Sequence, residues 1–234
     1  VFAFVHAEQS TGVRIDAGTL CRLANSAGML VIMDAVTSLA GIDLQADAWG
    51  ADVVYSGTQK CLSGLPGISP ITFSNDAVAA IQARKHKVQS WFLDMNLIMG
   101  YWGEGAKRSY HHTAPVNAVY AFHEALLMLE EEGLEASFAR HKANHLKLAA
   151  GLAELGLEMA VAEEWRLPQL NSVLIPEGLD DAKIRGRLLH EFDLEVGEGL
   201  GELAGKQWRI GLMGTSSNDV NINRCLTAFK AVLA

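Results

Sequence analysis

Cysteine is scarce in this 234-residue sequence, which contains only Cys21, Cys61 and Cys225. Their number is odd, their spacing is wide and no CxxC pair occurs, so the pattern disfavours a disulfide framework or a zinc ribbon. It favours a reducing compartment instead. Because no signal peptide is visible at the start either, we expect a cytoplasmic location.

Positive charge and long apolar runs are also lacking. The chain has 19 Lys and Arg against 27 Asp and Glu, a formal net charge of -8. A chain this acidic does not attract nucleic acid through its overall field, and the short basic run at residues 84–87 is typical of a solvated helix end. No apolar run reaches membrane-spanning length, so we expect neither a nucleic acid nor a membrane partner.

The first half of the chain alternates between apolar strands and amphipathic helices. Residues 1–5 resemble a buried strand already under way, which predicts that an upstream part is missing. A helix over 16–27 and strands over 29–33 and 52–56 follow, and this alternation is typical of an α/β fold with a parallel sheet. A further strand over 68–73 follows its neighbour so closely that we expect an antiparallel pair.

The pattern changes after Pro115, which suits the first turn of a helix running to residue 132. Gly133 breaks that helix, and a second helix follows to residue 155. We therefore place a domain boundary here, giving domains over 1–132 and 133–234. In the second domain we expect the strands 170–175, 194–196 and 208–212 and the helices 180–192 and 219–233.

Reactive side chains follow three successive strands of the predicted sheet. They are His6, Glu8 and Ser10 after the first strand, Asp34 after the second, and Gln59 and Lys60 after the third. Ligands of open parallel sheets bind beyond the carboxyl ends of the strands. Lys60 is either a solvent-facing loop residue or a partly desolvated amine, whose lowered pKa would let it attack a carbonyl.

Asp34 also has two interpretations. It is either the cap of a helical turn over 36–40 or a carboxylate that pairs with a protonated ring nitrogen. Pyridoxal phosphate (PLP) chemistry requires such a partner, because the charged ring is the electron sink. One strand–helix–strand unit separates Asp34 from Lys60, which predicts that both residues lie on neighbouring strand ends.

Three further patterns have both a structural and a functional interpretation. His6 could bind a metal with Glu8, His111 or His112, but zinc ligands are usually spaced more closely, so we expect no metal. The glycine pattern at residues 199–204 lacks the strand and helix of a dinucleotide site. Arg209, near the end of a short strand, is either a surface ion-pair partner or a bidentate clamp for a carboxylate.

Five motifs occur in an order that resembles the class V aminotransferases: HAEQSTG, MDAVTSL, YSGTQKCLSGLPG, SYHHTAPV and WRIGLMG. The resemblance covers nearly the whole chain, including the spacing between motifs, and is greatest to the alanine–glyoxylate and serine–pyruvate branch. It implies a PLP-dependent transferase of fold type I. Residues 1–132 would form a mostly parallel, incomplete large domain without its N-terminal third, and residues 133–234 a smaller α/β domain.

The resemblance also assigns roles around the cofactor. It implies that Lys60 binds PLP covalently and that Asp34 holds the ring nitrogen. Val36 would pack against the ring, Ser10 would hydrogen-bond near the ring hydroxyl, and Gln59 would contact the phosphate. The missing third supplies a glycine-rich phosphate cup and a stacking aromatic in this family.

The resemblance places a second group of residues farther out. Tyr110 and Thr113 are similar to the pair that reaches the phosphate of the neighbouring subunit, which implies a homodimer with shared active sites. Arg209 is similar to the clamp for the substrate α-carboxylate. Ala7 and Gln9 depart from the Gly and Ser of the close branch.

The implied reaction is transamination of a small amino acid, alanine or serine, to a 2-oxo acid such as glyoxylate or pyruvate. Three alternatives stay open on the same core. One is ureidoglycine–glyoxylate transamination. Another is cysteine desulfuration, for which Cys61 directly follows Lys60. The third is an inactive truncated chain that serves as a dimerisation module.

Overall fold

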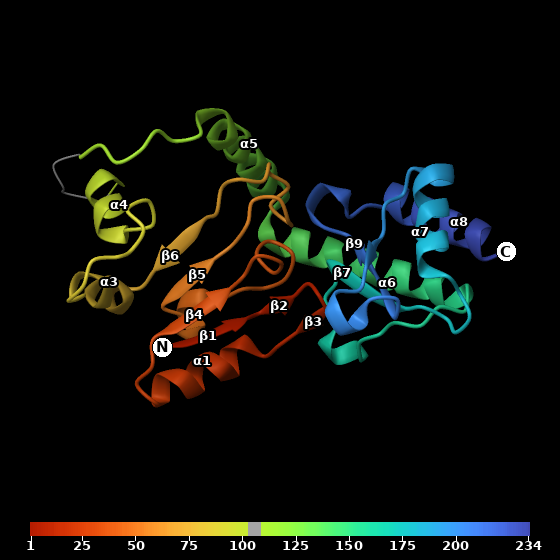
Figure 1. The fold of residues 1–234 in the computed structure, drawn as a ribbon, viewed down its shortest axis with the longest axis horizontal. Coiled ribbons are helices and arrows are strands. Elements are labelled where there is room, and N and C mark those ends of the chain that lie inside the picture. Colours follow the sequence, from red (N-terminus) through yellow and green to blue (C-terminus); the bar gives the residue numbers. More distant parts are fainter. Residues whose placement is uncertain (103–108) are drawn as a thin grey trace.

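Two larger β-sheets organise the described part of the chain, beside a two-stranded one (Figure 1). The computed structural model describes residues 1–102 and 109–234. Four strands from the first part of the chain form one sheet and three strands from the last part form the other, with a long helix, α6 (Leu134–Glu154), running between the two regions.

The first sheet has the strand order β1-β4-β5-β6. Its strands are β1 (Phe2–Val5), β4 (Val31–Asp34), β5 (Val53–Tyr55) and β6 (Ile71–Phe73). The first three are parallel, whereas β6 runs antiparallel to β5 as the short connecting loop predicted. Val5, Asp34 and Tyr55 are direct neighbours in the register, so three strands end together at one edge of the sheet.

Helices cover one face of this sheet. Both α1 (Ala17–Ser26), which is capped by the Asp16 carboxylate, and α2 (Ala46–Trp49) pack here, and Val31, Met33 and Val54 are buried in their core. Because side chains alternate along a strand, Asp34 and Tyr55 lie on the opposite face. Sheet pairing and helix packing therefore fix Asp34 and Tyr55 on the face away from α1.

Short elements that the sequence patterns did not predict complete this region. They are the paired strands β2 (Ala7–Glu8) and β3 (Val13–Arg14) and the helices α3 (Asn75–Gln82) and α4 (Met95–Trp102). The two strands are too short for a recognisable alternation, and the two helices span only about two turns each. A serine begins α3, because the Ser74 hydroxyl accepts from the Ala77 N–H.

The second sheet is antiparallel, with the order β7-β9-β8. Its strands are β7 (Leu170–Leu174), β8 (Gly197–Glu198) and β9 (Gln207–Gly211). The predicted strand over 194–196 is wrong: the chain leaves α7 through Asp193 in the left-handed region, and the Leu194 N–H donates to the carbonyl of Leu188. Pairing with β9 begins only at Gly197.

Three helices pack on this second sheet: α6, α7 (Asp181–Phe192) and α8 (Asp219–Leu233). The preceding helix α5 (Val116–Glu132) instead packs Phe122 and Leu129 near Cys61 and Leu62. Short 3-10 turns lie at Glu163–Trp165, Gly201–Leu203 and Gly214–Ser216. Trp208 and Phe229, both fully buried, pack against each other in the core between β9 and α8. Gly133, with φ of 84°, separates α5 from α6 where the sequence predicted a break.

Candidate active site

Asp34 is held rigidly at the end of β4. Its Oδ1 accepts the Val36 N–H at 2.8 Å, and its Oδ2 accepts the Tyr55 hydroxyl at 2.8 Å. The capping interpretation is partly confirmed by the first of these bonds, although residues 36–40 form turns rather than a helix. Each oxygen accepts one hydrogen bond, so lone pairs remain on a fixed carboxylate for another donor.

Lys60 lies in a tight loop after β5. The Ser56 hydroxyl donates to the Ala35 carbonyl at 3.0 Å, and the Ser63 N–H donates to the Lys60 carbonyl at 3.0 Å, so both ends of the loop are pinned. Lys60 is half-buried, whereas Gln59 is exposed. Across the described part of the chain, the Lys60 amine forms no ion pair or hydrogen bond.

Ser10 is coupled to a neighbouring carboxylate. Its hydroxyl and its backbone N–H both donate to Oε1 of Glu8, at 2.6 and 2.8 Å. Its carbonyl accepts the side-chain amide of Gln207 at 2.9 Å. The loop between β2 and β3 is therefore attached to strand β9 of the second sheet.

Arg209 reaches the same loop from β9. Its Nε donates to the Glu198 carbonyl at 2.8 Å and its Nη1 donates to the Gln9 carbonyl at 3.2 Å. Among residues 1–102 and 109–234, its Nη2 has no acceptor, so part of the guanidinium remains available to a carboxylate. The structure thus brings Arg209 beside the residue that precedes Ser10, although about 200 positions separate them in the sequence.

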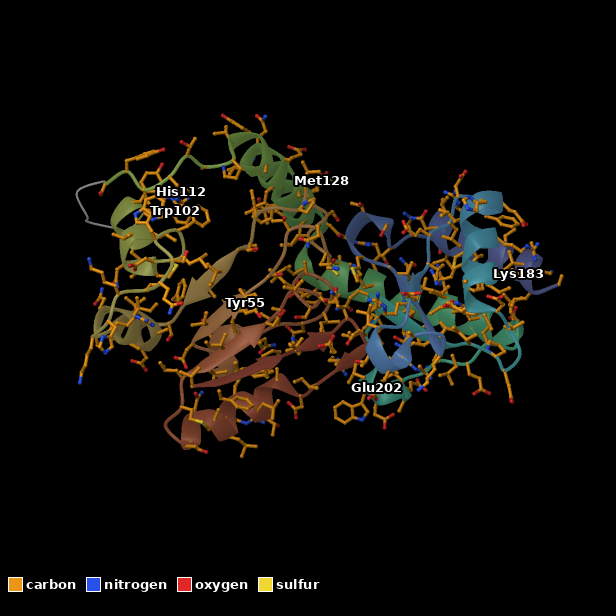
Figure 2. The ribbon with its side chains drawn as sticks, in the orientation of Figure 1. Tyr55, Trp102, His112, Met128, Lys183 and Glu202 are labelled. Carbon is orange, nitrogen blue, oxygen red and sulfur yellow. The ribbon has the colours of Figure 1, made fainter. Side chains whose placement is uncertain are left out.

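Tyr110 and Thr113 are placed differently. Their hydroxyls share a hydrogen bond of 2.7 Å, and both side chains are exposed on the segment before α5. His112, between them in the sequence, lies near Trp102 and well away from Tyr55 (Figure 2). The structure therefore gathers Ser10, Asp34 and Arg209 with the Lys60 loop, and leaves Tyr110 and Thr113 outside that group.

The histidines considered as metal ligands lie in two different places: His6 packs beside Trp49, whereas the Nδ1 atoms of His111 and His112 are 2.7 Å apart. His6 is 3% exposed, with its ring 5.4 Å from Trp49, and burial together with the Arg14 charge lowers its pKa to about 4. His111 stacks on Trp91 at 3.9 Å. Within the described residues, no group of three or more His, Cys, Asp or Glu side chains could hold a metal ion.

The three cysteines are buried and have inert surroundings. Burial raises the pKa of Cys61 and of Cys225 to about 12, and it raises the pKa of Cys21 as well. The thiolate is the nucleophilic form of cysteine. Cys61 therefore lacks the ionised sulfur that cysteine desulfuration needs.

Tyr55 is a further candidate site residue, which the sequence patterns did not indicate. It lies opposite Asp34 in the parallel register, and its side chain points to the same face. The available signal was the alternation of side chains along a strand. Once the two strands are paired in parallel, Tyr55 lies beside Asp34 and points to the same face, opposite to buried Val54.

Comparisons with known proteins identify the family and the fold. Residues 1–194 match the Aminotransferase class-V family, so the chain belongs to that family. Its fold is that of the PLP-dependent transferases of fold type I. In the part of the chain that the structure describes, no helix is both long and apolar enough to cross a membrane.

Three relatives align with nearly all of this chain. The crystal structure of an alanine–glyoxylate aminotransferase from Nostoc sp. superposes with a TM-score of 0.96 at 46% identity, covering 99% of this chain and 61% of that one. The alanine–glyoxylate aminotransferase of Oryctolagus cuniculus is 39% identical over 97% of this chain and 59% of its own length. A ureidoglycine–glyoxylate aminotransferase from Bacillus subtilis has a TM-score of 0.95 at 36% identity, covering 99% and 59%. The chain thus spans about 60% of the length of these relatives.

Proposed function

We propose that this chain contributes the lysine, the carboxylate and the arginine of a PLP-dependent aminotransferase. The observation that carries the proposal is the fixed Asp34 carboxylate on a strand end next to the strand that leads into Lys60. Membership of the class V family and the likeness to aminotransferase structures support it.

The residues present fit PLP. The Asp34 carboxylate keeps lone pairs free for a ring N–H, and the Lys60 amine forms no ion pair within the described residues. When bound, PLP supplies an electron sink for the charge that develops when a proton leaves the substrate. Asp34 would hold the ring nitrogen, Val36 would pack on the ring, and Ser10 and Gln59 would bind near the hydroxyl and the phosphate.

The chain's own groups would perform three tasks. Lys60 would hold the cofactor covalently and, once displaced by substrate, move a proton as general acid and base. Asp34 would keep the ring nitrogen protonated through its negative charge. Arg209 would bind the substrate carboxylate through the part of its guanidinium that the Gln9 and Glu198 carbonyls do not use.

For substrates we propose alanine or serine as amino donor and glyoxylate or pyruvate as acceptor. The names of the Nostoc and Oryctolagus relatives support alanine and glyoxylate. Ureidoglycine is a second candidate donor, because the Bacillus subtilis relative named for it covers the chain equally well. Cysteine is disfavoured by the buried, protonated Cys61.

We also propose a homodimer with shared active sites and a division of the chain at Gly133. The exposed side chains of Tyr110 and Thr113 support the dimer, because they lie outside the candidate site of their own subunit and could reach the site of a neighbouring subunit. The separate cores of the two sheets support domains over 1–132 and 133–234.

A two-substrate assay tests the reaction. The purified chain, saturated with PLP, is given alanine, serine or ureidoglycine together with glyoxylate or pyruvate, and the new amino acid is quantified by chromatography. We expect alanine with glyoxylate to yield glycine and pyruvate, and Lys60→Ala to abolish it. Turnover that survives in Lys60→Ala would contradict the proposal, and sulfide release from cysteine would favour desulfuration. Complete inactivity despite PLP bound at Lys60 would favour the dimerisation module.

A further inference from the structure

Four side chains at the beginning of α6 face three loops that carry or directly follow candidate site residues. Three of them, Ser137, His141 and Asn144, are at most 6% exposed, and Arg140 is half-buried beside them. Their spacing of three and four residues places them on one stripe of the helix. We call these four residues the α6 hub.

The hub holds the loop after β9, residues 212–218, which follows Arg209. The Nη1 of Arg140 donates to the carbonyls of Gly214 and Ser217 at 2.7 and 3.0 Å, while its other nitrogens form a bidentate pair with Glu132 across the α5–α6 break. Asn144 donates to the Ser217 carbonyl at 2.8 Å. This loop therefore cannot shift without breaking several hydrogen bonds to α6.

His141 forms two ring hydrogen bonds whose backbone partners fix which atom donates and which accepts. Its Nδ1 lies 2.7 Å from the Ser137 carbonyl, which can only accept, and its Nε2 lies 2.9 Å from the Gly214 N–H, which can only donate. The ring is therefore neutral, with its proton on Nδ1. Burial lowers the pKa of His141, which favours the same neutral form.

The Lys60 loop, residues 57–64, packs directly on this held segment. The Ser63 hydroxyl accepts the Thr215 N–H at 2.9 Å. Gly214 lies so close that a Cβ there would meet Ser63 Oγ at 1.9 Å and the Cys61 carbonyl at 2.9 Å. The loop after Asp34 is attached as well, because the Ser137 hydroxyl donates to the Ala40 carbonyl at 2.8 Å.

We propose that the α6 hub is a positioning device, which sets the separation of Asp34, Lys60 and Arg209 by fastening their three loops to one helix. The helix is a rigid element, and groups held by it keep a constant geometry. The role of the α6 hub in catalysis rests on the proposed function. The fastening itself is a property of the chain alone.

Hydrogen exchange followed by mass spectrometry tests the fastening without cofactor or substrate. His141→Phe removes both ring bonds at similar volume, His141→Gln keeps an acceptor for Gly214, and exposed His190→Gln serves as the control. We expect His141→Phe to accelerate exchange roughly tenfold in residues 212–218 and in residues 57–64, because a buried N–H loses its acceptor. His141→Gln should stay closer to the wild-type rates, and His190→Gln should match them.

Ser63→Ala keeps the test valid if His141→Phe disturbs the whole fold. Ser63 is exposed, so this variant should remain folded. It removes only the link between the two loops, and we expect faster exchange in residues 57–64 with little change elsewhere. Unchanged exchange of residues 57–64 in Ser63→Ala, and in folded His141→Phe, would overturn the proposal.

Steady-state kinetics separate positioning from folding. In the PLP-loaded protein, Ser63→Ala and His141→Gln should raise the KM for the amino donor several-fold more than they lower kcat, with PLP attachment to Lys60 unchanged. An equal KM in these variants and in His190→Gln would overturn the positioning role. If Lys60 binds no PLP in the wild type, the proposed function fails, and the exchange result still decides whether the hub fastens the loops.

Discussion

The hydroxyl of Tyr55 donates a 2.8 Å hydrogen bond to Oδ2 of Asp34, from the neighbouring parallel strand and from the paired position in the register. The carboxylate raises the pKa of the Tyr55 hydroxyl through this bond, which keeps the hydroxyl a donor. Together with the Val36 N–H, Tyr55 fixes both oxygens of the residue proposed to hold the ring nitrogen.

We expect Tyr55→Phe to lower the free energy of unfolding of the cofactor-free chain by about 1 kcal/mol, because a hydrogen bond to a charged acceptor is lost. Chemical denaturation of Tyr55→Phe, Asp34→Ala and the double variant measures the coupling. If the losses of unfolding free energy in the two single variants add up to the loss in the double variant, the two side chains do not interact in solution.

Arg209→Lys should raise the KM for the amino donor roughly tenfold or more, with a smaller effect on kcat. A lysine cannot form the bidentate contact with a carboxylate, and it also loses the bonds to the Gln9 and Glu198 carbonyls. Arg187→Lys is the matched control, because Arg187 pairs with Glu191 on the surface of α7. A similar KM in both variants would remove Arg209 from the substrate site.

Stability should decrease on acidification between about pH 6.5 and pH 4. Burial, with a smaller contribution from Arg14, lowers the pKa of His6 from its ordinary value of 6.5 to about 4, whereas Asp43 opposes the shift. In this range the unfolded chain therefore binds a proton at His6 that the folded chain does not. The free energy of unfolding decreases by roughly 3 kcal/mol from this residue as the pH falls. His141 and His145, whose pKa values are also lowered by burial, act in the same direction.

Denaturation curves between pH 8 and pH 4 measure this effect. In His6→Phe the decrease should become shallower by roughly the His6 contribution, since the replacement cannot be protonated. If the free energy of unfolding falls with pH equally steeply in the variant and in the wild type, the pKa of His6 is not lowered in the folded protein.

The cysteines should resist thiol reagents in the folded protein. Because burial raises the pKa of Cys61 and Cys225 to about 12, almost no thiolate is present at pH 7. We expect labelling to be slow and to accelerate sharply at the denaturant concentration that unfolds the chain. Rapid labelling of Cys61 in native conditions would restore the desulfurase alternative.

Much of the fold could be predicted from periodicity alone. The parallel strands of the first sheet are continuous apolar runs, and the helices α5 and α6 are long and are each followed within two residues by a glycine. Elements of two to eight residues, such as β2, β3, α3 and α4, were missed because their tertiary surroundings rather than their own pattern stabilise them. The strand predicted over 194–196 was misplaced because apolar residues that pack in a core also occur outside strands.

The candidate site was predictable only in part. Asp34 and Lys60 stood out because polar residues at the ends of buried strands mark a ligand site. The contact of Arg209 with Gln9 and the role of His141 depend on how two distant sheets meet, which no local pattern encodes. Tyr55 could have been found by pairing β4 with β5 in parallel and following the alternation.

The central claim is that Lys60 binds the cofactor. The chain is incubated with saturating PLP and reduced with borohydride, and modified lysines are mapped by mass spectrometry, with Lys60→Ala as the control. We expect modification concentrated at Lys60 in the wild type, and no modification of the peptide that contains residue 60 in the variant. Modification spread over exposed lysines such as Lys142, with Lys60 unmodified, would contradict it.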